Sequence, residues 1–434
     1  MLALLRPRSV FALALLLVAS MLRTLHWMPF SPNHLLFEFY VDAGILCSLL
    51  YSLVSLYGFN PARWRNDGPA ASGGVSFTRE RIFEGFAPMA RVSLVLLYFY
   101  AVFHKLNWDY FNPEISCGTF LTRGLLDQLH IAHFPYWGKL AAVWGTLVIE
   151  LLIPVLFLFG ATRRWGILLG LVFHFLLALH PHAGLYSFSA LLAGFFYLFT
   201  PPGFNGSLAA WFGRWRGRLR LAPYRAGVFV LAAGILFWWL HQYRQGGFVR
   251  AAFVLWYVGW GFAFAIYLRL FIAHPRDGRS FGAVFSLRPL MWVFVLVVFF
   301  NGLSPYLGLK TQTSYSMFSN LRTEGAATNH VLLPRRLFAG HWQDDLVTVV
   351  RTNAPVLQEF TDGRRMIAHF ELRRMASGMK EDFFVDYRRG GREHHLEVRQ
   401  GVSNDPATTR PHPWLVKKLV RFRPVYADTC HCQH

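Results

Sequence analysis

The chain has 434 residues, of which 54% are hydrophobic and only 15% are charged, and its formal net charge is +20. A water-soluble domain of this length needs more charged surface, so the composition excludes an ordinary soluble protein. The arginines flank apolar segments on both predicted sides of a bilayer. This pattern favours anionic lipid headgroups over nucleic acid as the partner of the positive charge.

Apolar runs long enough to cross about 30 Å of hydrocarbon, roughly 20 residues each, follow one another along the first 307 residues. We predict about nine transmembrane helices from them. Their residues are 9–25, 34–57, 86–106, 139–160, 165–180, 185–200, 226–242, 251–272 and 287–307. The first run also has the features of a secretory signal, because Arg6 and Arg8 precede an Ala/Leu-rich core. Both interpretations of that run stay open.

Arginines are distributed unequally between alternate loops. With the N-terminus inside, the inner segments carry the clusters at 63–81 and 214–225, whereas the outer loops carry scattered basic residues. The positive-inside rule then predicts a cytoplasmic N-terminus, and nine crossings place the C-terminal region outside. We expect a multi-pass protein of a bacterial inner membrane.

The apolar texture stops near residue 310. We therefore predict a transmembrane bundle over residues 1–310 and a small, β-rich extracytoplasmic domain over 311–434. In the second part, β-branched and aromatic residues alternate with turn signals in segments 345–352, 365–375, 382–390 and 394–401. The fold class is thus a polytopic α-helical membrane protein with a β-rich C-terminal domain.

Three of the four cysteines fall on the predicted outer side. Because that compartment is oxidising, we predict that Cys117 forms a disulfide with one of the tail cysteines, Cys430 or Cys432. The terminal sequence CHCQH also contains metal-ligating residue types. Five terminal residues have no fixed geometry, so we expect no metal there.

Ionisable side chains within spans are candidates for function, because they cost several kcal/mol unless they pair or face water. His34, Glu38 and Asp42 follow one another at four-residue spacing along one stripe of the second predicted span. Further candidates are Lys105 at the end of the third span, Trp108 just beyond it and Glu150 in the fourth span. In the fifth span they are His174 and, at its end, His180. The predicted topology brings acids, imidazoles and one amine toward the same layer of the membrane.

Each candidate also has a structural interpretation. Lys105 can extend its amine to the membrane surface, and Trp108 fits an interfacial aromatic belt. Glu150 can be a helix-packing partner, and His174 a satisfied interior imidazole. If Lys105 is instead held among aromatic rings, loss of water favours its neutral, basic form, which suits a lipophilic acid such as a hydroquinone.

Three stretches resemble the horizontally transferred transmembrane (HTTM) family, which includes the vitamin K-dependent gamma-glutamyl carboxylases. They are FYAVFHKLNWDYFNPEISCG, HFLLALHPHAGLYSFSALLAGFFYLFTPP and LSPYLGLKTQTSYSMFSNLRTEG. The matching positions are Lys105-Leu106, Trp108, Phe173-His174 and Ser187-Phe188, and the resemblance covers roughly residues 4–322.

The resemblance implies that Lys105 is the base that deprotonates reduced vitamin K, with His34 and His174 assisting. The products of oxygen addition then remove a γ-proton from a peptide glutamate, and CO₂ adds. Glu38, Asp42, Trp108, Glu150 and His180 would line the quinone site. The implied partners are the bilayer, a lipophilic quinone and an exported protein or peptide, and a disulfide to the outer domain also occurs in these carboxylases.

The chain departs from the carboxylases in two places. Asn107-Trp108-Asp109 follows the Lys-Leu pair where the carboxylases have Asp-Ala-Asp-Trp, and the outer domain is much smaller than that of the animal enzymes. The second hypothesis is accordingly a non-catalytic membrane scaffold whose outer domain binds an exported protein. It predicts that Lys105 and His174 tolerate replacement, whereas deletions after Gln312 abolish function.

Overall fold

The computed structural model describes residues 9–57, 79–180, 182–201, 203–218, 257–261, 263–269, 271, 277–325, 328–335, 337, 341–426, 429 and 431–432. The chain divides into two compact units. The first unit combines Met1–Pro154 with Phe285–His434, and the second unit is Val155–Val284. The N-terminal helices and the C-terminal sheet therefore belong to the same unit.

Four helices among the described residues are long and apolar enough to cross a membrane. They are α2 (Val10–Trp27), α3 (Asn33–Tyr57), α5 (Arg79–Phe103) and α8 (Tyr136–Leu158). Several long apolar helices support the prediction of a membrane protein, and these four coincide with the first four predicted spans.

The other predicted spans are not shown as crossings. Three of them coincide with shorter helices, α9 (Arg163–Leu177), α10 (Ala183–Tyr197) and α15 (Trp292–Leu303). At 15 residues, α9 is about 22 Å long, less than the thickness of the hydrocarbon core. Span 226–242 lies outside the described residues, and span 251–272 is described only in part. The number nine is therefore not confirmed.

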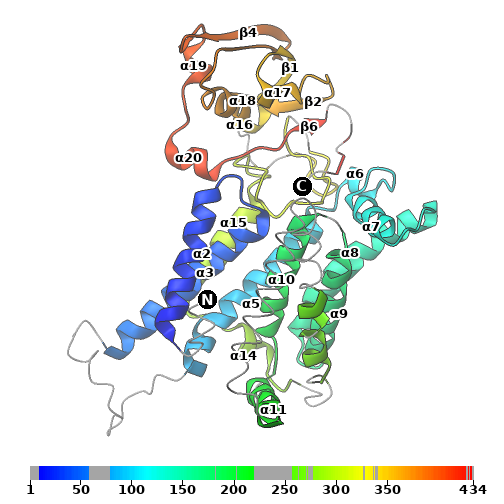
Figure 1. Cartoon of the computed structure of the whole chain (residues 1–434), viewed down its shortest axis with the longest axis vertical. Coiled ribbons are helices and arrows are strands. Elements are labelled where there is room, and N and C mark those ends of the chain that lie inside the picture. Colours follow the sequence, from blue (N-terminus) through cyan, green and yellow to red (C-terminus); the bar gives the residue numbers. More distant parts are fainter. Residues whose placement is uncertain are drawn as a thin grey trace. The chain divides into compact units, whose positions relative to one another are not determined.

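In the first unit, α2 packs on α3, α3 packs on α5, and α15 packs on both α3 and α5 (Figure 1). A glycine permits the close approach of α15 to α5. A Cβ atom added at Gly302 of α15 would lie 2.2 Å from the ring of Tyr100 on α5. The Tyr100 hydroxyl donates to the carbonyl of Phe299 at 2.8 Å, so the two helices are joined by packing and by a hydrogen bond.

The first unit also contains the short helices α6 (Trp108–Phe111) and α7 (Cys117–Gln128) and the 3-10 turn η1 (Pro289–Met291). The described part of the second unit contains α9, α10 and α11 (Phe204–Arg218), with α14 (Phe281–Phe285) at its end. Within the second unit, the buried guanidinium of Arg163 bonds Asp277 at 2.5 Å. Phe157 and Phe199 stack with ring centroids 4.2 Å apart.

The C-terminal region contains a six-stranded sheet in the order β5-β4-β3-β1-β2-β6, and its paired strands run antiparallel. The strands are β1 (Leu346–Thr352), β2 (Arg365–Ala368), β3 (Phe383–Arg389), β4 (Arg392–Arg399), β5 (Val402–Ser403) and β6 (Val425–Tyr426). The helices around them are α16 (His341–Asp344), α17 (Pro355–Gln358), α18 (His369–Ala376), α19 (Pro406–Thr409) and α20 (Trp414–Leu419). Alternate residues of β3, such as Val385 and Tyr387, enter the core, as expected for a sheet with one covered face.

One predicted strand is partly wrong. Of residues 365–375, only the first four form β2, and the rest belong to α18. Leu372 and Ala376, four residues apart, lie together in the core under the sheet, which is the helical spacing of an apolar face. Glu371 pairs with Arg374 at 2.5 Å and supports the same turn.

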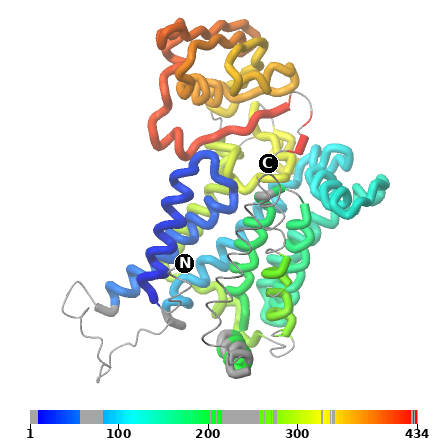
Figure 2. The backbone as a smooth tube through the Cα atoms, viewed as in Figure 1, coloured from blue at the N-terminus to red at the C-terminus, as the bar shows by residue number. Residues whose placement is uncertain are grey.

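Residues 304–325, which follow α15, contain no helix or strand, and we call residues 308–325 the buried segment. Its Thr313, Tyr315, Phe318 and Asn320 all have φ between 53° and 64°. The left-handed region is costly for residues other than glycine and persists only where the surroundings fix the backbone. Figure 2 shows this part of the chain, in yellow, between the helices of the first unit and the sheet.

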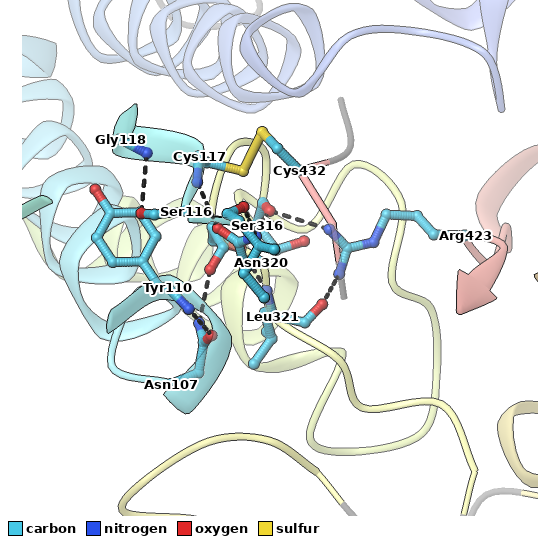
Figure 3. Close-up of a disulfide and its surroundings, with 12 residues drawn as sticks. Asn107, Tyr110, Ser116, Cys117, Gly118, Ser316, Asn320, Leu321, Arg423 and Cys432 are labelled. Carbon is cyan, nitrogen blue, oxygen red and sulfur yellow. Dashed lines mark hydrogen bonds between the residues drawn. A yellow bond between two sulfur atoms is a disulfide. The ribbon is translucent and has the colours of Figure 1, made fainter. Parts of the chain in front are cut away.

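A disulfide joins Cys117, the first residue of α7, to Cys432, at a sequence separation of 315 (Figure 3). Of the two predicted alternatives, Cys432 is therefore the partner. Pairing with Cys430 is wrong for this structure, because Cys117 has a single sulfur atom; Cys430 itself lies outside the described residues. Cys47 of α3 is free.

A buried lysine and glutamate as the candidate functional site

Lys105 lies in the turn that follows α5. Its backbone N–H donates to the carbonyl of Val102 at 2.9 Å, so the turn continues the helix by one more bond. The side chain bends back along α5, and Nζ donates to the carbonyl of Ala101 at 3.1 Å. With only 5% of its side chain exposed, Lys105 does not extend its amine to the membrane surface.

Glu150 of α8 is the counterion of Lys105. The distance from Nζ to Oε2 is 2.5 Å, and 12% of the Glu150 side chain is exposed. The ring of Tyr110 lies 6.0 Å from Nζ. A buried ion pair is held only where hydrogen bonds and geometry offset the loss of hydration. Here the turn after α5 supplies one partner and α8 the other, and the two residues are 45 positions apart in sequence.

The neighbouring His104 points to a different helix. Its Nε2 lies 3.0 Å from the carbonyl oxygen of Gly302 on α15. The imidazole lies between the rings of Tyr100 and Tyr306, with centroid distances of 5.3 and 5.6 Å. His104 thus anchors the end of α5 to α15, while Lys105 faces α8.

Asn107 fixes the backbone on the other side of Lys105. Its side-chain amide donates to the carbonyls of His104 at 2.8 Å and Ser319 at 2.6 Å. Its Oδ1 accepts from the N–H of Tyr110 at 2.8 Å and caps α6 (Figure 3). The turn that carries Lys105 is therefore fastened to the buried segment. The sequence signal for this cap is an Asn directly before a first turn that carries an acid, here Asp109.

Two further residues, Asn329 and His330, also bond to the chain around Lys105, and the sequence analysis did not predict them. The side-chain amide of Asn329 donates to Asp109 Oδ2 at 2.7 Å. The backbone carbonyl of Asn329 accepts from the backbone N–H of Trp108. His330 Nε2 donates to the carbonyl of Phe103 at 2.8 Å, and its Nδ1 accepts from two backbone N–H groups. Burial lowers the pKa of His330, in agreement with a neutral imidazole in this role. No local pattern marked these two residues, because they lie in irregular chain.

The predicted acids of α3 face α2. Glu38 bonds Arg23 at 3.2 Å and the hydroxyl of Ser20 at 3.0 Å. Asp42 lies one helical turn further along and is 8% exposed. His34 is buried at the start of the helix, and the adjacent Asn33 accepts from the N–H of Tyr315 at 2.7 Å. Through Asn33, the start of α3 is joined to the same buried segment that holds Asn107.

The remaining predicted residues have other surroundings. His174 and His180 belong to the second unit, where the His174 ring lies among Phe173, Phe188 and Phe196. His180 Nδ1 accepts from the N–H of His182 at 3.1 Å. Trp108, the first residue of α6, is 66% exposed.

Among the residues that the structure describes, no group of three His, Cys, Asp or Glu side chains is arranged to hold a metal ion. The comparisons with protein-family models, curated proteins and solved structures found no match to the chain. The centre of the candidate site is an amine and a carboxylate that are both largely buried.

Proposed function

We propose that the protein is an integral-membrane, carboxylase-like enzyme in which Lys105 removes a proton from a reduced quinone. The observation that carries the proposal is the contact of 2.5 Å between the buried Lys105 amine and Glu150. A base in apolar surroundings is suited to a substrate that arrives from the bilayer. The HTTM resemblance assigns the same lysine to the same step.

Lys105 and Glu150 act on the proton as one unit. For Lys105 to act as the base, Nζ first passes a proton to Oε2 of Glu150, with which it is in contact. When the unit accepts a second proton from a substrate hydroxyl, both groups are protonated and one positive charge remains. That charge stabilises the adjacent oxygen anion, which has little water to hydrate it.

The chemistry of these residues fits a reduced quinone of the vitamin K type. Such a cofactor would supply the weakly acidic hydroxyl and the electrons that reduce O₂. The chain's own contribution is to hold Lys105 by Ala101 and Glu150 and to fix the turn through Asn107. By the family resemblance, the second product is a carboxylated glutamate of an exported protein, with CO₂ as co-substrate.

The first experiment uses the purified chain in lipid nanodiscs with a reduced naphthoquinone and oxygen. We expect quinone epoxide to form, and Lys105→Ala to lower its rate by about 100-fold or more, the usual contribution of a general base. Lys139→Ala is the matched control, because Lys139 pairs with Glu114 at 2.6 Å in a more exposed position. We expect the control to keep the wild-type rate.

Epoxidation at the wild-type rate in Lys105→Ala would refute the assigned base. A folded wild-type protein that never oxidises the quinol would favour the scaffold hypothesis. Incorporation of isotopically labelled bicarbonate into co-expressed exported proteins tests the carboxylation step separately.

We propose the orientation with the N-terminus in the cytoplasm and the sheet outside, in a bacterial inner membrane. The arginine distribution and the Cys117–Cys432 disulfide both support it, because disulfides persist in oxidising compartments. Labelling of introduced cysteines by an impermeant reagent in intact cells tests this orientation.

A further inference from the structure

α20 presents apolar side chains outward. Trp414, Leu415 and Leu419 are 70%, 59% and 43% exposed. On the inner side, Val416 packs against the cluster formed by Ala368, Phe370 and Phe422. The outward side chains of this short helix therefore do not take part in the packing of the sheet region.

A direct contact fixes the position of α20 in the first unit. Lys418 Nζ donates to the carbonyls of Leu25 and His26, each at 3.1 Å. These carbonyls belong to the last turn of α2, where a cation is favoured by the helix dipole. Figure 1 shows α20 beside this end of α2.

The depth of that end follows from α2 itself. α2 is a candidate span, and only 17% of its apolar window is buried inside the protein. Most of its surface is then free to face lipid, so its last turn marks the boundary between hydrocarbon and headgroups. An element bonded to the last carbonyls of α2 lies at that boundary.

Residues around this end of α2 have the composition of a membrane interface. Trp27 and Phe30 are 59% and 55% exposed. The guanidinium groups of Arg374 and Arg421 lie 5.1 and 4.4 Å from the centre of the Phe30 ring. Aromatic rings next to basic groups are typical of the headgroup region.

We propose that α20, together with Trp27 and Phe30, is a lipid-docking surface of the C-terminal region. Trp414, Leu415 and Leu419 insert into the headgroup and upper acyl region of the leaflet in which α2 ends. The guanidinium of Arg421, next to Phe30, adds positive charge near the lipid phosphates, whereas that of Arg374 is paired with Glu371. The occupant is the bilayer because the surface continues the lipid-facing surface of α2.

Docking at this surface bears on the candidate site. Directly after α20, the carbonyl of Arg421 accepts from the N–H groups of Thr311 and Gln312 at 3.1 and 3.0 Å. The Arg423 guanidinium donates to the carbonyls of Ser316 and Leu321. Figure 2 shows this C-terminal stretch, in red, passing along the yellow buried segment. Lipid contact would thus hold the segment that positions the turn of Lys105.

The test places a nitroxide label on the full chain in vesicles of phosphatidylcholine and phosphatidylglycerol. Cys47 and Cys430 are replaced by serine, and one label position is introduced as Leu415→Cys. The matched control is Val402→Cys, which is 73% exposed on β5, the edge strand opposite β6. Relaxation by dissolved oxygen and by a water-soluble nickel chelate is measured at each position.

We expect the label at 415 to be relaxed more by oxygen than by nickel, and the label at 402 to show the reverse. Equal nickel accessibility at both positions would overturn the proposal. Low accessibility of the label at 415 to both reagents would also overturn it, because a protein partner would then cover the helix. Leu419→Cys provides a second position, and retention of the Cys117–Cys432 disulfide shows that each variant has folded.

Discussion

Two buried lysines of the first unit differ in the side chain to which their amine is bonded. Lys105 has the Glu150 carboxylate at 2.5 Å. Lys310, in the buried segment, is 8% exposed, and Nζ donates to the hydroxyl of Thr313 at 3.3 Å. Among the described residues no carboxylate pairs with Lys310. Burial consequently lowers the pKa of Lys310 to about 7.

The shift of Lys310 predicts a pH dependence of stability. Because its pKa in the folded chain, about 7, is below its ordinary value of 10.5, the unfolded chain binds more protons between these pH values. The free energy of unfolding therefore rises with pH between about 7 and 10.5. Below pH 7 the folded chain bears the full cost of burying the Lys310 charge. We expect Lys310→Met to raise the melting temperature most near pH 6 and to lose this advantage by about pH 10.

Melting temperatures of wild type and variant across this range check the prediction. The exposed Lys380→Met serves as the control and should give a constant difference at every pH. A Lys310→Met effect that does not change with pH would contradict the assigned ionisation.

The helices and strands show which local signals were sufficient. The four long apolar helices and β1, β3 and β4 agree with the sequence prediction. The second half of segment 365–375 forms a helix instead. Ile367 and Phe370 are compatible with a strand, but the core takes Leu372 and Ala376 on one helical face. The sequence of the buried segment shows neither the helical nor the strand spacing of apolar residues. Its backbone conformation depends on side chains from distant elements.

Asn107 is the clearest of these connections between elements. Its replacement by alanine leaves the buried carbonyls of His104 and Ser319 without this donor, and the N–H of Tyr110 without its acceptor. We expect Asn107→Ala to lower the free energy of unfolding by about 2–3 kcal/mol, the range for buried polar groups left unsatisfied. Asn112→Ala, which removes an exposed bond of 3.1 Å to the N–H of Glu114, should cost less than about 1 kcal/mol.

Unfolding in denaturing detergent, followed by circular dichroism, measures both variants. Equal losses for Asn107 and Asn112 would show that the turn after α5 is not fastened as the hydrogen bonds indicate.

At the scale of the whole molecule, a disulfide joins the C-terminal tail to the start of α7. The bond connects Cys117 to Cys432 across 315 positions. Next to it, the Asn320 side chain accepts from the N–H of Cys117 at 2.7 Å, so the buried segment meets the disulfide (Figure 3). The tail, the buried segment and the loop after α6 thus form one connected region.

The disulfide makes a prediction that separates the tail cysteines. Peptide mapping without reduction should find Cys117 linked to Cys432 in the wild type and in Cys430→Ser. Cys432→Ser should lose this link and unfold more easily, by about 2–4 kcal/mol, because the unfolded chain is no longer constrained. Loss of the linked peptide in Cys430→Ser, with retention in Cys432→Ser, would contradict the pairing.

The sequence by itself determined the membrane character, the long helices, the sheet-forming C-terminal region and the choice of Lys105 and Glu150 as unusual residues. Each of these follows from composition or from a period within one segment. Only the tertiary structure decided that Lys105 faces Glu150, that Glu38 faces Arg23 and that Cys432 is the cysteine joined to Cys117. Such pairings depend on how separate elements pack, and the energy of a distant contact leaves no pattern in the local sequence.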